Sequence, residues 1–140
     1  MATSRYPVDD HIRVLFVEND PAVAEMYKLK LELDGYDVTI VPIGEEVLDK
    51  AASVAPDLVF LDTQRHEDGG MATLRALRNA PTTRSVPVII LSSLQADELA
   101  ASGFKADVMD YVVHADITLS SLSRNIDAWS APVAGAATRR

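Results

Sequence analysis

The chain has 140 residues, a hydrophobic share of 48%, a formal net charge of −8 and no cysteine. Its length suits one domain with one core, its apolar content excludes a disordered chain, and the missing cysteines exclude disulfides and thiolate metal sites. No segment predicts a signal peptide or a membrane span, and an acidic domain repels nucleic acid, so we expect a cytoplasmic protein without direct nucleic-acid or membrane contact.

The chain begins with a polar segment, residues 1–11, which we expect to be a flexible arm. Ile12–Val17 follows as a short apolar run, typical of a strand that is covered on both faces. Asp20 and Pro21 then predict a helix start, because aspartate caps helices and proline suits the first helical position. We expect this helix to end near Gly35. Its core-facing side is predicted from apolar residues at spacings of four, three and four: Ala22, Met26, Leu29 and Leu33.

The alternation of strand and helix continues along the rest of the chain. Further strands are predicted at Asp37–Val41, Asp57–Leu61, Val88–Leu91 and Asp110–Val113. Further helices are predicted at Glu45–Val54, Gly70–Asn79, Gln95–Ser102 and Ile117–Trp129. Thr63–Gly69 is polar and predicts a loop, whereas residues 130–140 lack periodicity and predict a flexible tail. The folded domain is therefore expected to span residues 12–129.

Alternating strands and helices predict an α/β fold in which a parallel five-stranded sheet carries helices on both faces. In such sheets, ligands bind beyond the carboxyl ends of the strands. We therefore expect the functional site among the residues that follow four of the strands: Glu18, Asn19 and Asp20; Asp62, Thr63 and Gln64; Ser92 and Ser93; His114 and Ala115.

This edge combines carboxylates, hydroxyls and a basic side chain. Carboxylates gathered at one edge repel each other unless a cation lies among them, and oxygen ligands suit a hard ion such as Mg²⁺. A carboxylate next to Mg²⁺ can act as a nucleophile toward a phosphoryl group. The ion and a cationic side chain would neutralise the phosphoryl oxygens, and a hydroxyl would donate a hydrogen bond to one of them. The pattern therefore indicates phosphoryl transfer to a carboxylate.

Four segments resemble the signature regions of response regulator receiver domains of bacterial two-component signalling: VLFVENDPAVAEMY, PDLVFLDTQRHEDGG, VPVIILSS and DYVVHAD. The resemblance runs from about Arg13 to about Asp127. It implies the flavodoxin-like receiver fold with strand order 2-1-3-4-5, the order of the chemotaxis member of the family. It also implies a phosphorylation switch rather than an ordinary enzyme, although a receiver assists its own phosphorylation and dephosphorylation.

The resemblance implies roles for the residues at the first and third strands. Asp62 stands at the position of the phosphoacceptor aspartate. Glu18 and Asn19 stand at the acidic pair that binds Mg²⁺ together with Asp62, and Gln64 stands where the family offers a backbone carbonyl to the metal. Asn19 replaces the aspartate that usually binds the metal directly, so we expect weak Mg²⁺ binding. Asn19 as a mere helix cap is an equally supported interpretation, whereas Asp20 is expected to be the cap itself rather than a substitute ligand.

The resemblance also implies roles at the fourth and fifth strands. Ser92 matches the hydroxyl that contacts the phosphoryl group, and Tyr111 matches the aromatic residue whose rotation accompanies activation. His114 replaces the usual lysine, and Ala115 replaces the proline that follows that lysine, which leaves a trans path for the loop. Two interpretations of His114 stay open: a pH-dependent partner of the phosphoryl group, or a surface residue.

Three classes of function remain in competition. The leading hypothesis is a receiver that takes a phosphoryl group onto Asp62 from a histidine kinase or a histidine phosphotransfer protein. The alternative is a pseudo-receiver that binds proteins without being phosphorylated, which the three departures favour. An aspartate-based phosphatase is disfavoured by Gln64, where a second carboxylate is wanted, and a flavin site is disfavoured by Glu18 and Asp20, which repel phosphate.

Only residues 130–140 follow the last predicted helix, so no output domain follows in this sequence. We expect the signal to pass to a downstream protein by direct contact, or the chain to be a piece of a longer protein. A homodimer through the face made by the last helices and strand is a further expectation.

Overall fold

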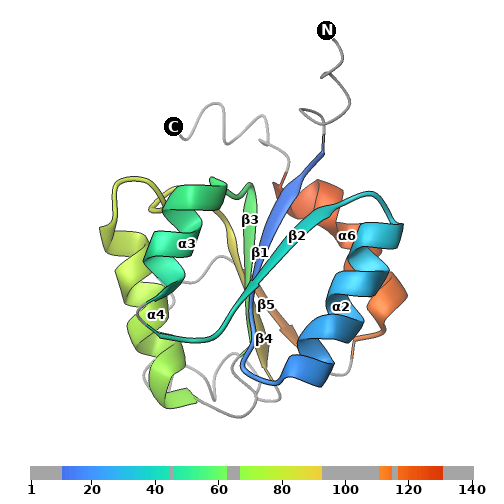
Figure 1. Ribbon diagram of the computed structural model, residues 1–140, viewed down its shortest axis with the longest axis horizontal. Coiled ribbons are helices and arrows are strands. Elements are labelled where there is room, and N and C mark those ends of the chain that lie inside the picture. The colour runs from blue at the N-terminus through green and yellow to red at the C-terminus, as the bar shows by residue number, and fades with distance from the viewer. Residues whose placement is uncertain (1–10, 45, 63–66, 93–110, 115–116, 131–140) are drawn as a thin grey trace, which may run out of the picture.

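The computed structural model describes residues 11–44, 46–62, 67–92, 111–114 and 117–130, with 67–70 and 111–114 described by their backbone. Figure 1 shows a sheet flanked by helices on both sides. The strands are β1 (Arg13–Val17), β2 (Asp37–Val41), β3 (Leu58–Asp62), β4 (Val88–Ser92) and β5 (Tyr111–His114). The helices are α2 (Pro21–Leu33), α3 (Glu46–Val54), α4 (Glu67–Asn79) and α6 (Leu119–Ser130).

The five strands form one parallel sheet in the order β2-β1-β3-β4-β5. The predicted fold class and strand order are thereby confirmed. The largest error in a predicted boundary is at α4, which begins at Glu67 and so takes in the end of the loop expected at Thr63–Gly69. The polar run that ends at Gly69 suggested a loop, but acidic residues at 67 and 68 suit the first turn of a helix. The last helix likewise begins at Leu119 rather than at Ile117. The helix predicted at Gln95–Ser102 lies outside the described residues.

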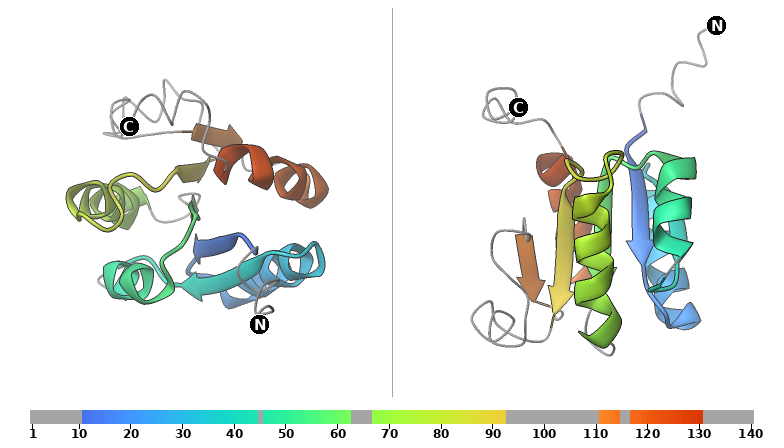
Figure 2. Two further views of the ribbon diagram at one scale, coloured as in Figure 1. Left: turned by 90° about the horizontal axis from the view of Figure 1, so that it is seen from above. Right: turned by 90° about the vertical axis from the view of Figure 1, so that its left-hand side faces the viewer.

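Two apolar clusters fill the space between the sheet and its helices. The first lies between the sheet and helices α3 and α4, with Val47, Ala51, Leu74 and Leu77 against the side chains of β1, β3 and β4. The second lies on the opposite face, beneath α2 and α6. Figure 2 shows the two pairs of helices on the two sides of the sheet. Every residue of β3 and β4 is buried, which is why both strands are nearly continuous apolar runs in the sequence.

Aromatic rings run through the cluster beneath α2 and α6. Phe16 of β1 stacks on Tyr27 of α2 with ring centroids 4.5 Å apart, and lies 5.1 Å from Phe60 of β3. Phe60 meets Trp129 of α6 edge to face at 6.0 Å. These contacts join both helices to the two strands that lead to the predicted site.

Helix α2 packs on the sheet with the face opposite to the one predicted. Its buried residues are Ala24, Tyr27 and Leu31, whereas Met26, Leu29 and Leu33 are 48%, 55% and 83% exposed. Both sets have helical spacing, so α2 is apolar on two opposite sides. The side that packs on the sheet is the one that carries Tyr27, whose ring stacks on Phe16.

Polar contacts join the end of α2 to α6. Tyr36, just after α2, donates a hydrogen bond from its hydroxyl to Asp127 Oδ1 at 3.0 Å, and Ser123 Oγ donates to Asp34. Burial and this contact with Asp127 raise the pKa of Tyr36 to about 12, so the phenol stays a donor at any ordinary pH. The contacts fix the two helices of this face relative to each other.

Replacing Tyr36 with phenylalanine is expected to lower the free energy of unfolding by about 1 kcal/mol, the usual net value of one such hydrogen bond. Denaturant unfolding near neutral pH measures it. Asp127→Asn retains an acceptor and should cost less. Equal stability of Tyr36→Phe and the wild type would show that the contact contributes nothing.

Among the described residues, no helix is both long enough and apolar enough to cross a bilayer.

Candidate functional site at the carboxyl edge of the sheet

The carboxyl ends of β1, β3, β4 and β5 meet at the lower edge of the sheet in Figure 1. Val17 pairs with Leu61 in the register of β1 and β3, so the next residues, Glu18 and Asp62, are level with each other. On the other side of β3, Asp62 pairs with Leu91, and Ser92 pairs with His114. The parallel register therefore brings together four positions that the sequence singled out.

Glu18 and Asp62 form a buried carboxyl pair, each only 7% exposed. Hydrogen bonds hold both the backbone and the side chain of Glu18. Its backbone N–H donates to the Val41 carbonyl at 3.0 Å, and its Oε2 accepts from the Asp20 N–H at 3.1 Å. Its other oxygen, Oε1, is buried and receives no hydrogen bond from the residues described. A buried carboxylate oxygen without a donor is costly, and such an oxygen is suited to a cation.

Burial, together with the neighbouring Asp62 carboxyl, raises the pKa of Glu18 from 4.5 to about 8. The Asp20 N–H lowers it, but only in part. Two carboxyl groups that share a buried site do not both ionise easily, so Glu18 holds a proton at neutral pH. A divalent cation between the two would replace this proton and stabilise both charges.

Asn19 is exposed, and its side chain makes a contact that was not predicted. Its Oδ1 accepts a hydrogen bond from the Ile43 N–H at 2.7 Å, which joins the loop after β1 to the loop after β2. The cap of α2 is Asp20, whose Oδ1 accepts from the N–H groups of Ala22 and Val23. The expected role of Asp20 is confirmed, and the interpretation of Asn19 as the cap of this helix was wrong.

The structure describes some of the remaining predicted site residues in full, some by their backbone and some not at all. Ser92 ends β4 and is 2% exposed. Tyr111 begins β5 and His114 ends it, so their backbones lie at opposite ends of this edge strand. Gln64 and Ala115 lie outside the described residues.

Within the described part of the chain, no three or more His, Cys, Asp or Glu side chains gather into a metal-binding group. The candidate site there rests on two carboxylates, Glu18 and Asp62. One residue near it was missed from the sequence: burial and the charges of Asp62 and Glu18 raise the pKa of Tyr27. Tyr27 sits on the inner side of α2, which the apolar spacing had assigned to solvent.

Comparison with known protein families matches residues 14–122 to the response regulator receiver domain. A curated relative is the transcriptional regulatory protein CseB of Streptomyces coelicolor, which is 38% identical over 104 residues. That match takes in 74% of this chain but only 43% of CseB. The chain thus spans less than half the length of this relative.

Solved structures agree with the fold. The signal receiver domain of a signal transduction histidine kinase from Syntrophus aciditrophicus is 27% identical, with a TM-score of 0.72 over 87% of this chain and 92% of that one. The receiver domain of the sensor histidine kinase PA1611 from Pseudomonas aeruginosa, solved with a magnesium ion coordinated in its active site cleft, is 24% identical. Its TM-score is 0.70 over 86% of this chain and 98% of that chain.

Proposed function

Because this chain belongs to the family of response regulator receiver domains, we propose that it accepts a phosphoryl group on Asp62. The donor is a histidine kinase or a histidine phosphotransfer protein of a two-component system. The observation that carries the proposal is the buried pair of Glu18 and Asp62, level with each other at the carboxyl edge of the sheet. Such a pair is stable only when a proton or a cation offsets the repulsion between its two charges. A cation bound there would also assist phosphoryl transfer.

In the proposed reaction, one carboxylate oxygen of Asp62 attacks the phosphorus of the donor's phosphohistidine. The phosphorus–nitrogen bond breaks, the donor imidazole takes up a proton, and an acyl phosphate forms on Asp62. The strand register holds Asp62 between β1 and β4, so the nucleophile has a fixed position before the donor arrives. Ser92, one residue beyond the partner of Asp62 on β4, is placed to donate a hydrogen bond to a phosphoryl oxygen.

The residues present fit a magnesium ion. Mg²⁺ usually takes one or two carboxylates, keeps several waters and binds the phosphate itself, and it would neutralise charge on the phosphoryl oxygens when bound. Glu18 Oε1 and Asp62 supply the carboxylates, and the Gln64 backbone carbonyl is the third proposed ligand. Asn19 adds no charge, and its Oδ1 accepts from Ile43, which supports a weak site.

Replacing Asn19 with aspartate is expected to tighten Mg²⁺ binding about tenfold, because ligand charge sets the affinity of such sites. Aspartate retains an oxygen that can accept from the Ile43 N–H, so the loop contact is preserved. Isothermal titration with Mg²⁺ measures the change, and Asn79→Asp at the far end of α4 is the matched control. Unchanged or weaker binding in Asn19→Asp would place residue 19 outside the metal shell.

His114 is proposed as the cationic partner of the phosphoryl group, in place of the family's usual lysine. Its backbone ends β5 next to Ser92 of β4. An unperturbed histidine has a pKa of about 6.5 and is charged mainly in mild acid. We therefore expect His114 to stabilise the phosphoryl group more strongly in mild acid than at neutral pH. Tyr111, at the start of the same strand, is proposed as the residue that reports phosphorylation to the neighbouring surface.

The domain that carries these functions is proposed to span residues 12–129, and its output is proposed to be contact with a downstream protein. The alternative function, a pseudo-receiver that binds proteins without phosphorylation, is favoured by one observation: Asn19 uses its side-chain oxygen in a loop contact. Intact-mass measurement after incubation with acetyl phosphate and Mg²⁺ separates the two. Addition of a single phosphoryl group supports the receiver. No addition from acetyl phosphate or from a cognate kinase would establish the pseudo-receiver.

A further inference from the structure

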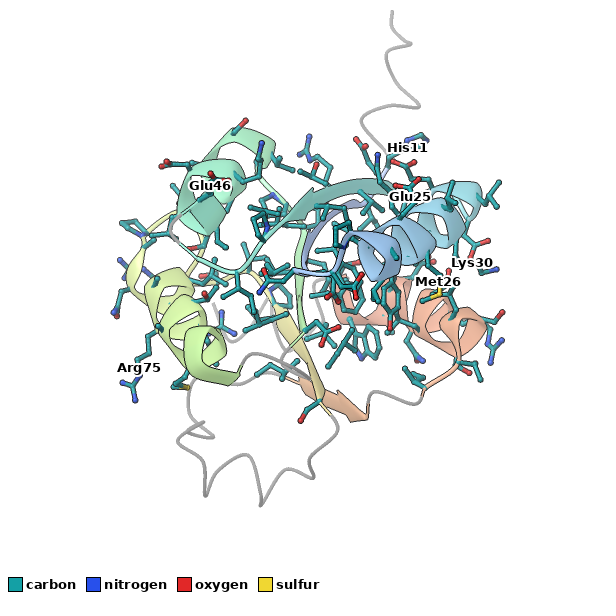
Figure 3. The ribbon with its side chains drawn as sticks, turned by 60° about the horizontal axis from the view of Figure 1, so that its bottom comes forward. His11, Glu25, Met26, Lys30, Glu46 and Arg75 are labelled. Carbon is teal, nitrogen blue, oxygen red and sulfur yellow. The ribbon has the colours of Figure 1, made fainter. Side chains whose placement is uncertain are left out.

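The outer side of α2 is the main apolar feature on the described surface. Met26, Leu29 and Leu33 are the only large hydrophobic side chains that are exposed among the residues described, and all three belong to this helix. Ala22, one turn before Met26, is exposed as well. Large apolar side chains gathered on one surface commonly mark an interaction site. Figure 3 labels Met26 on α2, together with Glu25 and Lys30.

The spacing of these residues indicates what kind of partner they fit. Ala22, Met26, Leu29 and Leu33 are separated by four, three and four residues, the alternation of a and d positions in a heptad repeat. They therefore form a narrow stripe, here called the α2 seam, that lies opposite the buried face of Tyr27 and Leu31. A narrow seam of this kind packs against another helix along its length rather than against a flat sheet or a bilayer.

The charged residues beside the α2 seam indicate which helix it accepts. With Met26 at position a and Leu29 at position d, Glu25 takes position g and Lys30 takes position e. In a parallel pair of such helices, a g residue faces the e residue five positions further along the partner. Glu25 of one copy then meets Lys30 of the other, twice by symmetry. An antiparallel pair would instead set Glu25 near Glu32 of the other copy, which is repulsive.

We propose that the α2 seam is the contact surface of a homodimer, in which two copies of α2 pack in parallel about a two-fold axis. Lys30 also lies 3.2 Å from Asp34 of its own helix, but that exposed pair is weak and leaves the ammonium group able to reach a second carboxylate. Since α2 begins at the edge that carries Asp62, a parallel dimer presents both phosphoacceptor sites on the same side. This interface differs from the last helix–strand–helix face expected from the sequence.

The α2 seam is short, because twelve residues of helix extend only about 18 Å. An interface of this size is small, so we expect a reversible dimer with a dissociation constant below about 1 mM rather than an obligate one. Sedimentation equilibrium of the chain over a wide concentration range, without a phosphodonor, measures it.

Two sets of variants test the position and the direction of the contact. Leu29→Asp is expected to raise the dissociation constant at least about tenfold, because it places a carboxylate in the seam. Ala52→Asp, at an exposed position of α3, adds the same charge elsewhere and should leave the dissociation constant unchanged.

The second set reverses charges. Lys30→Glu should weaken the dimer by repelling Glu25 of the partner copy, and Glu25→Lys combined with Lys30→Glu should restore it. The double variant does not restore the Lys30–Asp34 contact within one copy. Recovery of the dimer would therefore come from the contact between residue 30 of one copy and residue 25 of the other. Thermal unfolding of each variant verifies that it is folded.

The absence of cysteine from the sequence allows a direct test of the helix direction. In the parallel dimer, residue 33 of each copy lies next to residue 33 of the other, so Leu33→Cys should form an intermolecular disulfide under mild oxidation. Arg75→Cys on α4, at a residue labelled in Figure 3, is the control and should form no intermolecular disulfide. A wild type that remains monomeric up to about 1 mM would overturn the proposal and assign the α2 seam to a helix of another protein. A dimer that Leu29→Asp leaves intact, or that the double charge reversal fails to restore, would also overturn it.

Discussion

Asp62→Asn is expected to abolish phosphoryl addition completely, the largest effect that any single substitution in this chain should have on the proposed function. The amide lacks the charge and the nucleophilicity of a carboxylate, while its shape lets the strand register around it persist. The measurement is the intact mass of the protein after incubation with a small phosphodonor and Mg²⁺.

The control for this variant is Asp57→Asn, at the residue just before the amino end of the same strand. Asp57 is exposed and accepts a hydrogen bond from the Arg13 N–H at 2.9 Å, which an asparagine oxygen can also accept. Asp57→Asn should therefore be phosphorylated like the wild type. Phosphoryl addition that persists in Asp62→Asn would move the acceptor to another residue and remove the proposed role of Asp62.

Replacing Glu18 with glutamine should produce the largest change in stability. In the folded protein Glu18 has a pKa of about 8, whereas in the unfolded chain its pKa is near 4.5. Between these two values the folded state binds the proton and the unfolded state does not, so the free energy of unfolding falls as the pH rises from about 4.5 to 8. Glutamine does not ionise and can donate a hydrogen bond to Asp62. At pH 8, without divalent cations, we expect Glu18→Gln to be more stable than the wild type by on the order of 3 kcal/mol.

Denaturant unfolding at pH 5 and at pH 8, with a chelator present, measures this difference. Below pH 4.5 the two proteins should converge, since Glu18 is then protonated in both the folded and the unfolded state. Glu25→Gln, on the exposed side of α2, should retain the pH dependence of the wild type. Adding Mg²⁺ at pH 8 should stabilise the wild type but not Glu18→Gln. A wild type whose stability does not fall between pH 5 and pH 8 would contradict the shared-proton arrangement.

Much of the fold could be predicted from the sequence because parallel strands, buried on both faces, leave strong local signals. The apolar runs that became β3 and β4 each end at the residue expected at the site edge, Asp62 and Ser92. The helix start at Asp20 and Pro21 was likewise predictable, because capping depends on neighbours within three residues.

The features that could not be predicted depend on contacts distant in sequence. The spacing of apolar residues in α2 allowed either of two sides to face the sheet, and the side that packs is the one whose Tyr27 stacks on Phe16. The hydrogen bond from Ile43 to Asn19 joins residues 24 positions apart, and no local pattern encodes it. The raised pKa of Glu18 arises from burial beside Asp62, which the sequence places 44 positions away.

The position of β3 at the centre of the sheet has a mechanical consequence. Asp62 ends a strand that is hydrogen-bonded on both sides, by β1 and by β4, and covered by apolar clusters above and below. Its backbone is therefore held in a stiff part of the molecule, where a local opening would expose much of the core. A charge added there has little freedom to move its own strand. Under the proposed phosphorylation, a displacement is therefore expected at the two margins of the sheet, β2 and β5, each of which has a partner strand on only one side.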